Sequence, residues 1–267
     1  YETNEIGFQT RADYKALAAA VQYAEVAPSI GRYFQAWHYY LVGWNFDGDV
    51  GNQASNIGLY WMFDNQWSLN VNSNANYGRV SDRLSRGGPI MGYNNDVGIN
   101  ANLTTNQSKV WSVQLGQYQR RDVAEEYDSY YWMNFNWRPR SNIQLVFGPE
   151  LSYELDQDQY VTTVSRRAID PDADQTYGYR YIFATNKSSN LSANIRLNWT
   201  FSPRMTLETY IRPYVQSARF SGFGELKQER TFDFDFYGVD EGELNDLGAG
   251  LYEVSFGDEE PTSFRFY

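Results

Sequence analysis

Catalysis by a histidine or a cysteine has little support in this sequence. His38 is the only histidine among the 267 residues, and the chain contains no cysteine. A hydrolase of the nucleophile–histidine–carboxylate type would therefore have to use His38. Thiol catalysis, thiolate zinc sites and histidine-based metal sites are excluded by the counts. Because the neighbours of His38 are the aromatic residues Trp37 and Tyr39, a structural position is favoured, and we predict no catalytic residue and no enzyme activity.

Three carboxylates alternate in a short polar segment and suggest a cation site. Asp170, Asp172 and Asp174 have the alternating spacing of a calcium loop. The sixth position is Gln175 in place of glycine and the twelfth is Tyr181 in place of glutamate, so the segment is not an EF-hand. A solvated loop tip is the alternative interpretation. Calcium at this loop is the only cofactor or metal that the sequence suggests.

A cluster of arginines beside a glycine-proline turn is a second candidate site. One interpretation is an ordinary loop with a tight turn. The other is a loop that folds inward, so that its guanidinium groups face acidic residues or an anionic ligand. The residues concerned are Arg79, Arg83, Arg86, Gly87, Gly88 and Pro89.

The elements that would hold these residues are indicated by an alternation of apolar and polar side chains. Between 66 and 77, for example, Leu69 and Val71 fall on one face and a series of asparagines on the other. An alternation with a period of two is typical of β-strands that have two unlike surroundings. The clearest stretches are 66–77, 97–104, 131–137 and 195–201.

The nature of the polar residues favours a membrane barrel over a soluble sandwich. In a soluble sheet the outer face meets water, and lysine and glutamate predominate there. Here the polar positions hold mainly asparagine, glutamine, serine, threonine and glycine, which suits a hydrated lumen, while the apolar positions would face lipid. The stretches also reach the length of about 9–11 residues that a tilted strand needs to cross a bilayer. The positions predicted to face the lumen include Asn70, Asn72, Asn74, Asn100, Asn102, Asn134, Asn136, Arg196 and Asn198.

Short and long connections alternate along the chain, as in outer-membrane barrels. We therefore predict an all-β, transmembrane, antiparallel up-and-down β-barrel, with its strands and loops in 1–237. An acidic, glycine-rich tail or loop at 238–267 is left unplaced. If Pro139 and Pro203 both lie at periplasmic turns, two separate strands are expected near 158–166 and 178–186. The other strands are predicted near 14–26, 32–46, 54–64, 66–78, 94–105, 108–119, 128–138, 141–154, 190–202 and 204–217, with a weaker one near 228–237.

Composition excludes several other classes of protein. Aromatic residues make up 18% of the chain, which excludes disorder. There is no apolar run of about 18 residues, so a helical membrane protein is excluded. The formal net charge of −11 argues against a nucleic-acid partner.

Four segments have the order and approximate spacing of a known family: NEIGF at 4–8, DRLSRGGP at 82–89, YRYIFA at 179–184 and FSPRMTLETY at 201–210. Together they resemble the barrel region of large bacterial envelope proteins, in which a family-9-like carbohydrate-binding module precedes a barrel domain of unknown function. The resemblance implies a Gram-negative outer-membrane location and no known reaction. It also implies that the chain is part of a larger barrel, completed by more strands or by a partner chain, because lipid does not tolerate open sheet edges.

Two classes of function follow from this interpretation. The first is a porin-like channel or uptake protein for a small polar solute, or a barrel component of an envelope assembly. The second is a surface glycan-binding or adhesion protein whose barrel is only its membrane anchor, since exposed tyrosine and tryptophan rings can stack on sugars. The expected partners are outer-membrane lipid and either other envelope proteins or a glycan. An open lumen would support transport, and a lumen packed with side chains would support anchoring.

Overall fold

Antiparallel β-strands form nearly all the regular structure of this protein. The structure is a computed structural model that describes residues 11–165, 173–256 and 263–267. Within these ranges the only helical element is a short 3-10 turn, η1 (Ala173–Thr176). None of the helical structure described is long and apolar enough to span a membrane. The prediction of an all-β, antiparallel fold is therefore confirmed.

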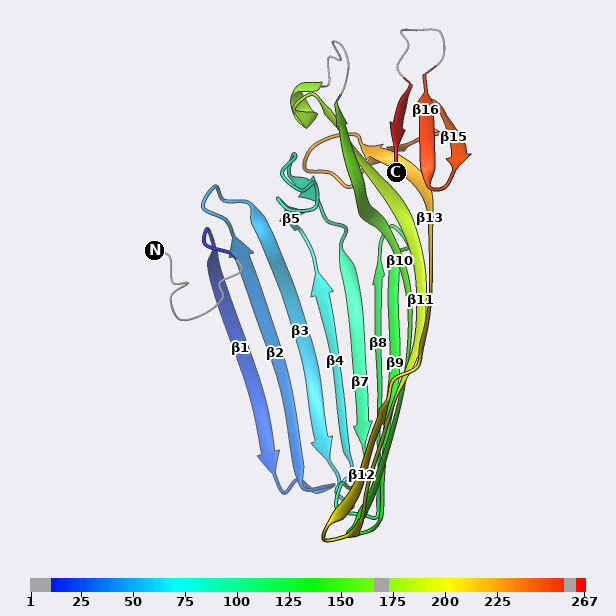
Figure 1. Cartoon of the computed structure of the whole chain (residues 1–267). Coiled ribbons are helices and arrows are strands. Elements are labelled where there is room, and N and C mark those ends of the chain that lie inside the picture. The colour runs from blue at the N-terminus through cyan, green and yellow to red at the C-terminus, as the bar shows by residue number, and fades with distance from the viewer. Residues whose placement is uncertain (1–10, 166–172, 257–262) are drawn as a thin grey trace.

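One twelve-stranded sheet forms the body of the molecule (Figure 1). Its strands follow one another as a meander, since most neighbours in sequence are also neighbours in the sheet. They are β1 (Lys15–Val26), β2 (Tyr33–Trp44), β3 (Val50–Met62), β4 (Ser68–Asn76), β7 (Asp96–Thr104), β8 (Trp111–Asp122), β9 (Tyr127–Arg140), β10 (Ile143–Ser165), β11 (Tyr179–Ser202), β12 (Met205–Ile211), β13 (Tyr214–Leu226) and β14 (Phe234–Phe236).

The last long strand of the sheet is interrupted but keeps its register. β12 pairs with β11 through Ile195 and Ile211, and β13 continues the same register through Ser192 and Tyr214. The break falls at Arg212 and Pro213, because proline has no N–H to donate to a ladder. β12 and β13 are therefore one edge strand, and the sheet consists of ten long strands and the short β14.

The sheet is open in the part of the chain that the structure describes. β1 lies at one edge and the joined β12–β13 strand at the other, on opposite sides of the molecule in Figure 1, and no pairing joins them. The short β14 covers only the last three residues of β13. With ten antiparallel strands in sequence, the two edge strands run in opposite directions. The structure thus establishes a curved antiparallel sheet.

β10 and β11 differ from the sequence-based expectation. They are single strands of 23 and 24 residues, whereas each was predicted as two strands separated by a turn. The polar segment near Asp156 resembles a turn in sequence, but the register shifts there and near Tyr160 are bulges, which bend a strand without ending it. Pro139 and Pro203 still lie at the same end of the sheet. Any even number of strands between them has this result, so the two strands β10 and β11 are enough.

The two ends of the sheet differ. The short-turn end carries the brief connections at 27–32, 63–67, 105–110, 141–142 and 203–204. The long-loop end carries the longest connections, above all 77–95 between β4 and β7, which contains the short strands β5 (Val80–Ser81) and β6 (Met91–Gly92). Its connections at 45–49 and 123–126 are short, in contrast to the predicted alternation. This second end also holds a three-stranded sheet of β15 (Glu243–Gly248), β16 (Leu251–Ser255) and β17 (Phe264–Phe266).

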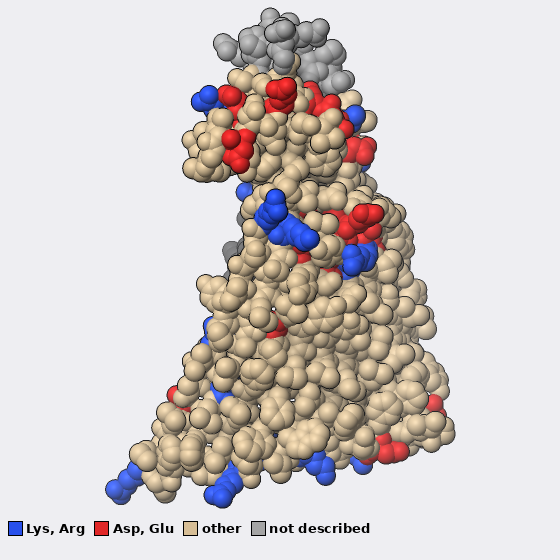
Figure 2. All heavy atoms as spheres, turned by 90° about the vertical axis from the view of Figure 1, so that its right-hand side faces the viewer, with Lys and Arg blue, Asp and Glu red and all other residues tan. Residues whose placement is uncertain are grey.

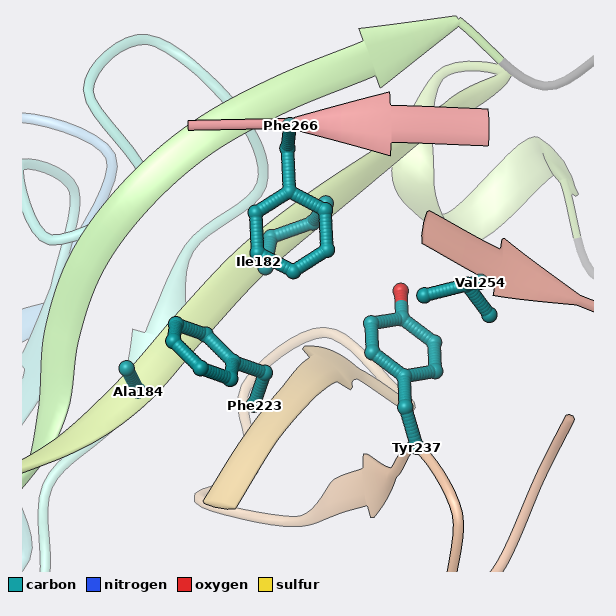
Figure 3. Packing of buried hydrophobic residues seen from close by; sticks show 6 residues of the cluster. All are labelled: Ile182, Ala184, Phe223, Tyr237, Val254 and Phe266. Carbon is teal, nitrogen blue, oxygen red and sulfur yellow. The ribbon is translucent and has the colours of Figure 1, made fainter. Parts of the chain in front are cut away.

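The buried apolar core lies at the long-loop end. One cluster joins β11 and β13 to the three-stranded sheet, and Figure 3 shows its rings and methyl groups meeting: Ile182, Ala184, Phe223, Tyr237, Val254 and Phe266. A second cluster joins the 77–95 loop to the same strands through Met91, Tyr181, Phe183 and Leu226. Among the described residues, the eight strands β1 to β4 and β7 to β10 contribute no buried apolar side chain. These eight strands thus have no apolar core of their own.

The twelve-stranded sheet has one polar and one apolar face. Residues that pair across strands share a face, so the pairs Asn70–Asn102 and Leu69–Leu103 in β4 and β7 define the two faces. The apolar face is largely open: Val97 is 57% exposed and Leu191 is 54% exposed. Stacked rings lie at its short-turn end, such as Trp199 on Phe201 with ring centroids 4.4 Å apart.

Candidate functional site

The polar face of the sheet is the candidate functional surface. Strand pairing places all nine residues that were predicted to face a lumen on this one face, across β4, β7, β9 and β11. Side chains two residues apart on one strand are joined by hydrogen bonds. Asn72 Nδ2 donates to Asn70 Oδ1 at 3.2 Å, and Asn102 Nδ2 donates to Asn100 Oδ1 at 2.6 Å. The asparagines therefore form a hydrogen-bonded polar lining.

Two tryptophans also lie on the polar face, which the sequence analysis did not single out. Trp37 crosses from β2 over Gly58, and Trp132 crosses from β9 over Gly116, so that a Cβ at either glycine would overlap the indole ring. Glycine is therefore required opposite each ring. The signal was present in the alternation, because Trp132 is in phase with the asparagines of its own strand.

The 77–95 loop is fastened to the polar face by Arg79. Its Nη2 lies 2.6 Å from Oδ2 of Asp96, whose side chain is almost fully buried. Asn76 Nδ2 donates to the other oxygen of the same carboxylate at 2.7 Å. The guanidinium also lies 4.9 Å from the ring centroid of Tyr93. Charge-assisted contacts of this kind hold the base of the loop against the sheet.

The tip of the same loop reaches from β4 and β7 across to β10 and β11. A Cβ at Gly88 would overlap the ring of Tyr181, and Ser85 Oγ donates to the carbonyl oxygen of Pro89 at 2.7 Å. Gly87 has a φ of +99°, which L side chains rarely adopt. The glycine-proline turn thus allows the close approach of the loop to the far side of the sheet.

Arg83 and Arg86 meet acidic residues where the loop reaches β10. They line a hollow of about 260 Å³ together with Asp156 and Asp158. The Arg86 guanidinium also lies 4.6 Å from the ring centroid of Tyr160. The six residues of the predicted arginine loop are therefore brought together, and two of the three arginines share a hollow with carboxylates.

A carboxylate cluster that the sequence analysis missed lies beside this hollow. Oxygen atoms of Glu126, Asp156 and Asp158 lie within 4.8 Å of one another, close enough to share a divalent cation. Glu126 Oε1 accepts a hydrogen bond from the Gln157 backbone N–H at 2.8 Å. No sequence pattern joins residues 30 positions apart, and 155–157 was expected to be a turn. The cluster exists because the bulge in β10 turns two carboxylates toward the β8–β9 loop.

Crowding and burial change the protonation of this cluster. Burial, with the neighbouring Asp156 second, raises the pKa of Asp158 to about 9. Burial also raises the pKa of Glu126 to about 7, and the nearby Asp122 carboxylate adds to the effect. Both groups belong to the long-loop end of the sheet. Protonation relieves repulsion among carboxylates that are held this close.

Replacing Asp158 by asparagine is expected to stabilise the long-loop end at pH 9 and to change little at pH 5. A carboxyl group whose pKa is raised in the folded state contributes stability below its ordinary pKa of about 4, and this contribution is lost as the pH rises toward the folded value. Asparagine keeps position 158 neutral at every pH, so the gain in stability should increase between pH 5 and pH 9.

Thermal unfolding in chelator at both pH values measures this effect, with Asp64→Asn in an exposed short turn as the control. Equal effects of the Asp158 and Asp64 substitutions at pH 9 would contradict the assignment of the raised pKa.

The structure describes the surroundings of His38 but not those of the predicted calcium loop. His38 lies on the apolar face, where its Nε2 is 2.9 Å from Ser55 Oγ, and no contact with a carboxylate is found for it among the described residues. The calcium prediction rests on Asp170, Asp172 and Asp174. The first two residues and the side chain of the third lie outside the described part of the chain, so calcium there stays a prediction.

The fold and the polar face define an all-β protein built around an open antiparallel sheet with one polar and one apolar face. Residues 1–243 match the model of a family described as a domain of unknown function (DUF5916), and the chain belongs to this family. The match agrees with the resemblance to a domain of unknown function, and the family description names no activity. Neither the curated proteins nor the solved structures that were compared with the chain gave a match.

Proposed function

We propose that the sheet is the wall of a bacterial outer-membrane β-barrel through which a small polar solute passes. One observation carries the proposal: among the described residues, eight strands of the sheet (β1 to β4 and β7 to β10) have no buried apolar side chain, while large apolar side chains cover the exposed face of the sheet. An apolar surface of this extent is unfavourable in water and marks an interaction surface. Lipid is the surrounding that stabilises such a face along a whole series of strands.

Strand length and the distribution of charge support a membrane location. β4 and β7 have 9 residues each, and β1, β2 and β8 have 12, close to the span of about 9–11 that a tilted strand needs. In Figure 2 the broad middle of the molecule carries few charged side chains, whereas charges gather at its lower rim and at the long-loop end. The stacked rings at the short-turn end suit an interfacial aromatic girdle.

A membrane barrel requires both free edges of the sheet to be paired. Unpaired backbone N–H and C=O groups are not tolerated in the hydrocarbon region. Because β1 and the β12–β13 strand run in opposite directions, they can pair directly or be joined by an even number of additional strands. We propose that further strands or a partner chain complete the wall.

Passage of a solute is favoured over anchoring by the hollows on the polar face. Side chains do not fill this face: besides the hollow at Arg83 and Arg86, a larger one of about 580 Å³ lies between β8 and β12. A surface glycan-binding or adhesion protein remains the alternative, in which the polar face would be packed and the solute would bind at the long-loop end. If the protein is a channel, the 77–95 loop across the polar face narrows its passage.

Deleting residues 80–90 is expected to raise single-channel conductance in planar bilayers. The deleted segment crosses the polar face as far as Tyr181 of β11, and it places Arg83 and Arg86 in a hollow on that face. Its removal should therefore widen the proposed passage. Charge reversal by Arg83→Glu and Arg86→Glu, which keeps the loop, should shift ion selectivity toward cations.

The matched control is charge reversal at Arg138, which is exposed at the short-turn end of β9. Unchanged conductance and selectivity in both loop variants would show that the loop does not face a pore. Recovery of the native protein from the soluble fraction would overturn the membrane location itself.

A further inference from the structure

The larger hollow on the polar face lies toward the short-turn end of the sheet. β8 to β12 line it, together with Gln107 from the turn before β8. Its volume of about 580 Å³ falls within the range of about 300–1,000 Å³ that is usual for sites that bind small molecules. Aromatic, amide and charged side chains surround it, and their contacts define its chemistry.

A chain of hydrogen bonds fixes the polar groups of this hollow. Tyr210 Oη donates to Asn194 Oδ1 at 3.0 Å, and Asn194 Nδ2 donates to Glu150 Oε1 at 3.0 Å. The second oxygen of Glu150 lies 3.9 Å from Arg212 Nη2. These contacts hold hydrogen-bond donors and acceptors next to one another in fixed positions. The Asn194 amide and the Arg212 guanidinium have more donors than these contacts use, so they can also bind a ligand.

Aromatic rings are held in place around the same hollow. Trp132 crosses to β8 over the notch at Gly116, so the position of its indole is set by the absence of a side chain there. Tyr210 stands on the neighbouring side, and the guanidinium of Arg196 lies 5.0 Å from its ring centroid. Rings fixed in this way are platforms for the apolar face of a ligand.

The balance of charge distinguishes between classes of solute. Glu150 stands among the donors and would repel a free anion, while Arg196 and Arg212 would repel a cation. A neutral ligand rich in hydroxyl groups avoids both costs and pairs with carboxylate, amide and guanidinium groups at once. Sugars combine such hydroxyl groups with a C–H face that packs on aromatic rings.

We propose that this hollow binds a neutral saccharide and that the solute of the channel is a sugar. The saccharide site itself is inferred from the lining of the hollow, and its place in a passage rests on the function proposed above. The sugar would stack against Trp132 and exchange hydrogen bonds with Asn194 and Glu150.

The test uses the full-length protein purified in detergent and a panel of neutral mono- to tetrasaccharides. Calorimetric titration measures binding without a membrane, and sugar-dependent block of single-channel current measures it in bilayers. We expect at least one neutral sugar to bind and to block. Trp132→Ala and Glu150→Ala should each raise both the dissociation constant and the half-blocking concentration at least tenfold.

Trp37→Ala is the matched control, because Trp37 occupies an equivalent notch over Gly58 but lies outside the hollow. It should bind sugar as the unmodified protein does. Channels that conduct but are blocked by no neutral sugar, together with no binding in detergent, would overturn the saccharide site and leave the channel intact. Binding only to uronic acids would also overturn it. Sugar binding without any channel would overturn the proposed passage and leave the saccharide site.

Discussion

Replacing Glu225 by glutamine is expected to destabilise the long-loop end by about 3–5 kcal/mol, since the change removes one partner of a buried ion pair. Glu225 is 2% exposed. Its two oxygens each accept a hydrogen bond from Arg180 Nη1 at 2.8 Å, and Oε2 also accepts one from Tyr237 Oη at 2.9 Å. Glutamine would leave the buried Arg180 charge with Glu241 as its remaining counter-charge, which is more exposed and lies farther away, at 3.9 Å.

Aromatic rings next to Arg180 would hinder water from hydrating its charge in this variant. Its guanidinium lies 4.4 Å from the ring centroid of Phe256, which directly follows β16, and 5.4 Å from that of Phe264 in β17. Loss of the Glu225–Arg180 ion pair should therefore weaken the packing of the three-stranded sheet on β11 and β13. Limited proteolysis between 243 and 256 and thermal unfolding measure the effect.

Glu253→Gln is the matched control for this ion pair. Glu253 belongs to the same small sheet, and its Oε1 lies 2.9 Å from Nε of Arg265, whose side chain is exposed. Exposed pairs contribute about 0–1 kcal/mol. Similar losses in the Glu225 and Glu253 variants would show that the buried pair has no special role.

Replacing Ile99 by arginine is expected to cost about 2–4 kcal/mol if the centre of β7 lies near the bilayer midplane. Ile99 is exposed on the apolar face, and a guanidinium there would enter hydrocarbon. Asn100 is the next residue of the strand and points to the opposite face, where its neighbours are polar. Asn100→Arg should therefore cost much less, although the two positions lie at the same depth.

Denaturant unfolding of the protein in lipid vesicles measures both variants under one condition. The amount of each protein recovered from the outer-membrane fraction provides a second reading. Equal costs at the two neighbouring positions would contradict a lipid-facing surface, because only unlike surroundings distinguish residues at the same depth.

The local alternation of residues determined much of the fold. The period of two is a property of an extended backbone, whose successive side chains point to opposite faces. It therefore predicted most strands of the large sheet and assigned all nine polar positions to one face before any pairing was known. The glycine-proline turn likewise indicated a loop able to fold inward, because glycine and proline act through their own backbone geometry.

Other features depend on which strands pair and in which register, and the sequence could not determine them. The polar segment near Asp156 reads as a turn, and only pairing with β11 makes it a bulge within one long strand. That bulge brings Asp156 and Asp158 to Glu126, which joins them from the β8–β9 loop.

The hollow beside Trp132 has the same origin as the carboxylate cluster. Gly116 leaves room for the indole only because the register places these two residues opposite each other. The sequence by itself therefore determined which residues share a face, whereas the tertiary structure decided which of them meet. Contacts between distant residues follow from strand register, and register is settled by the packing of the whole sheet.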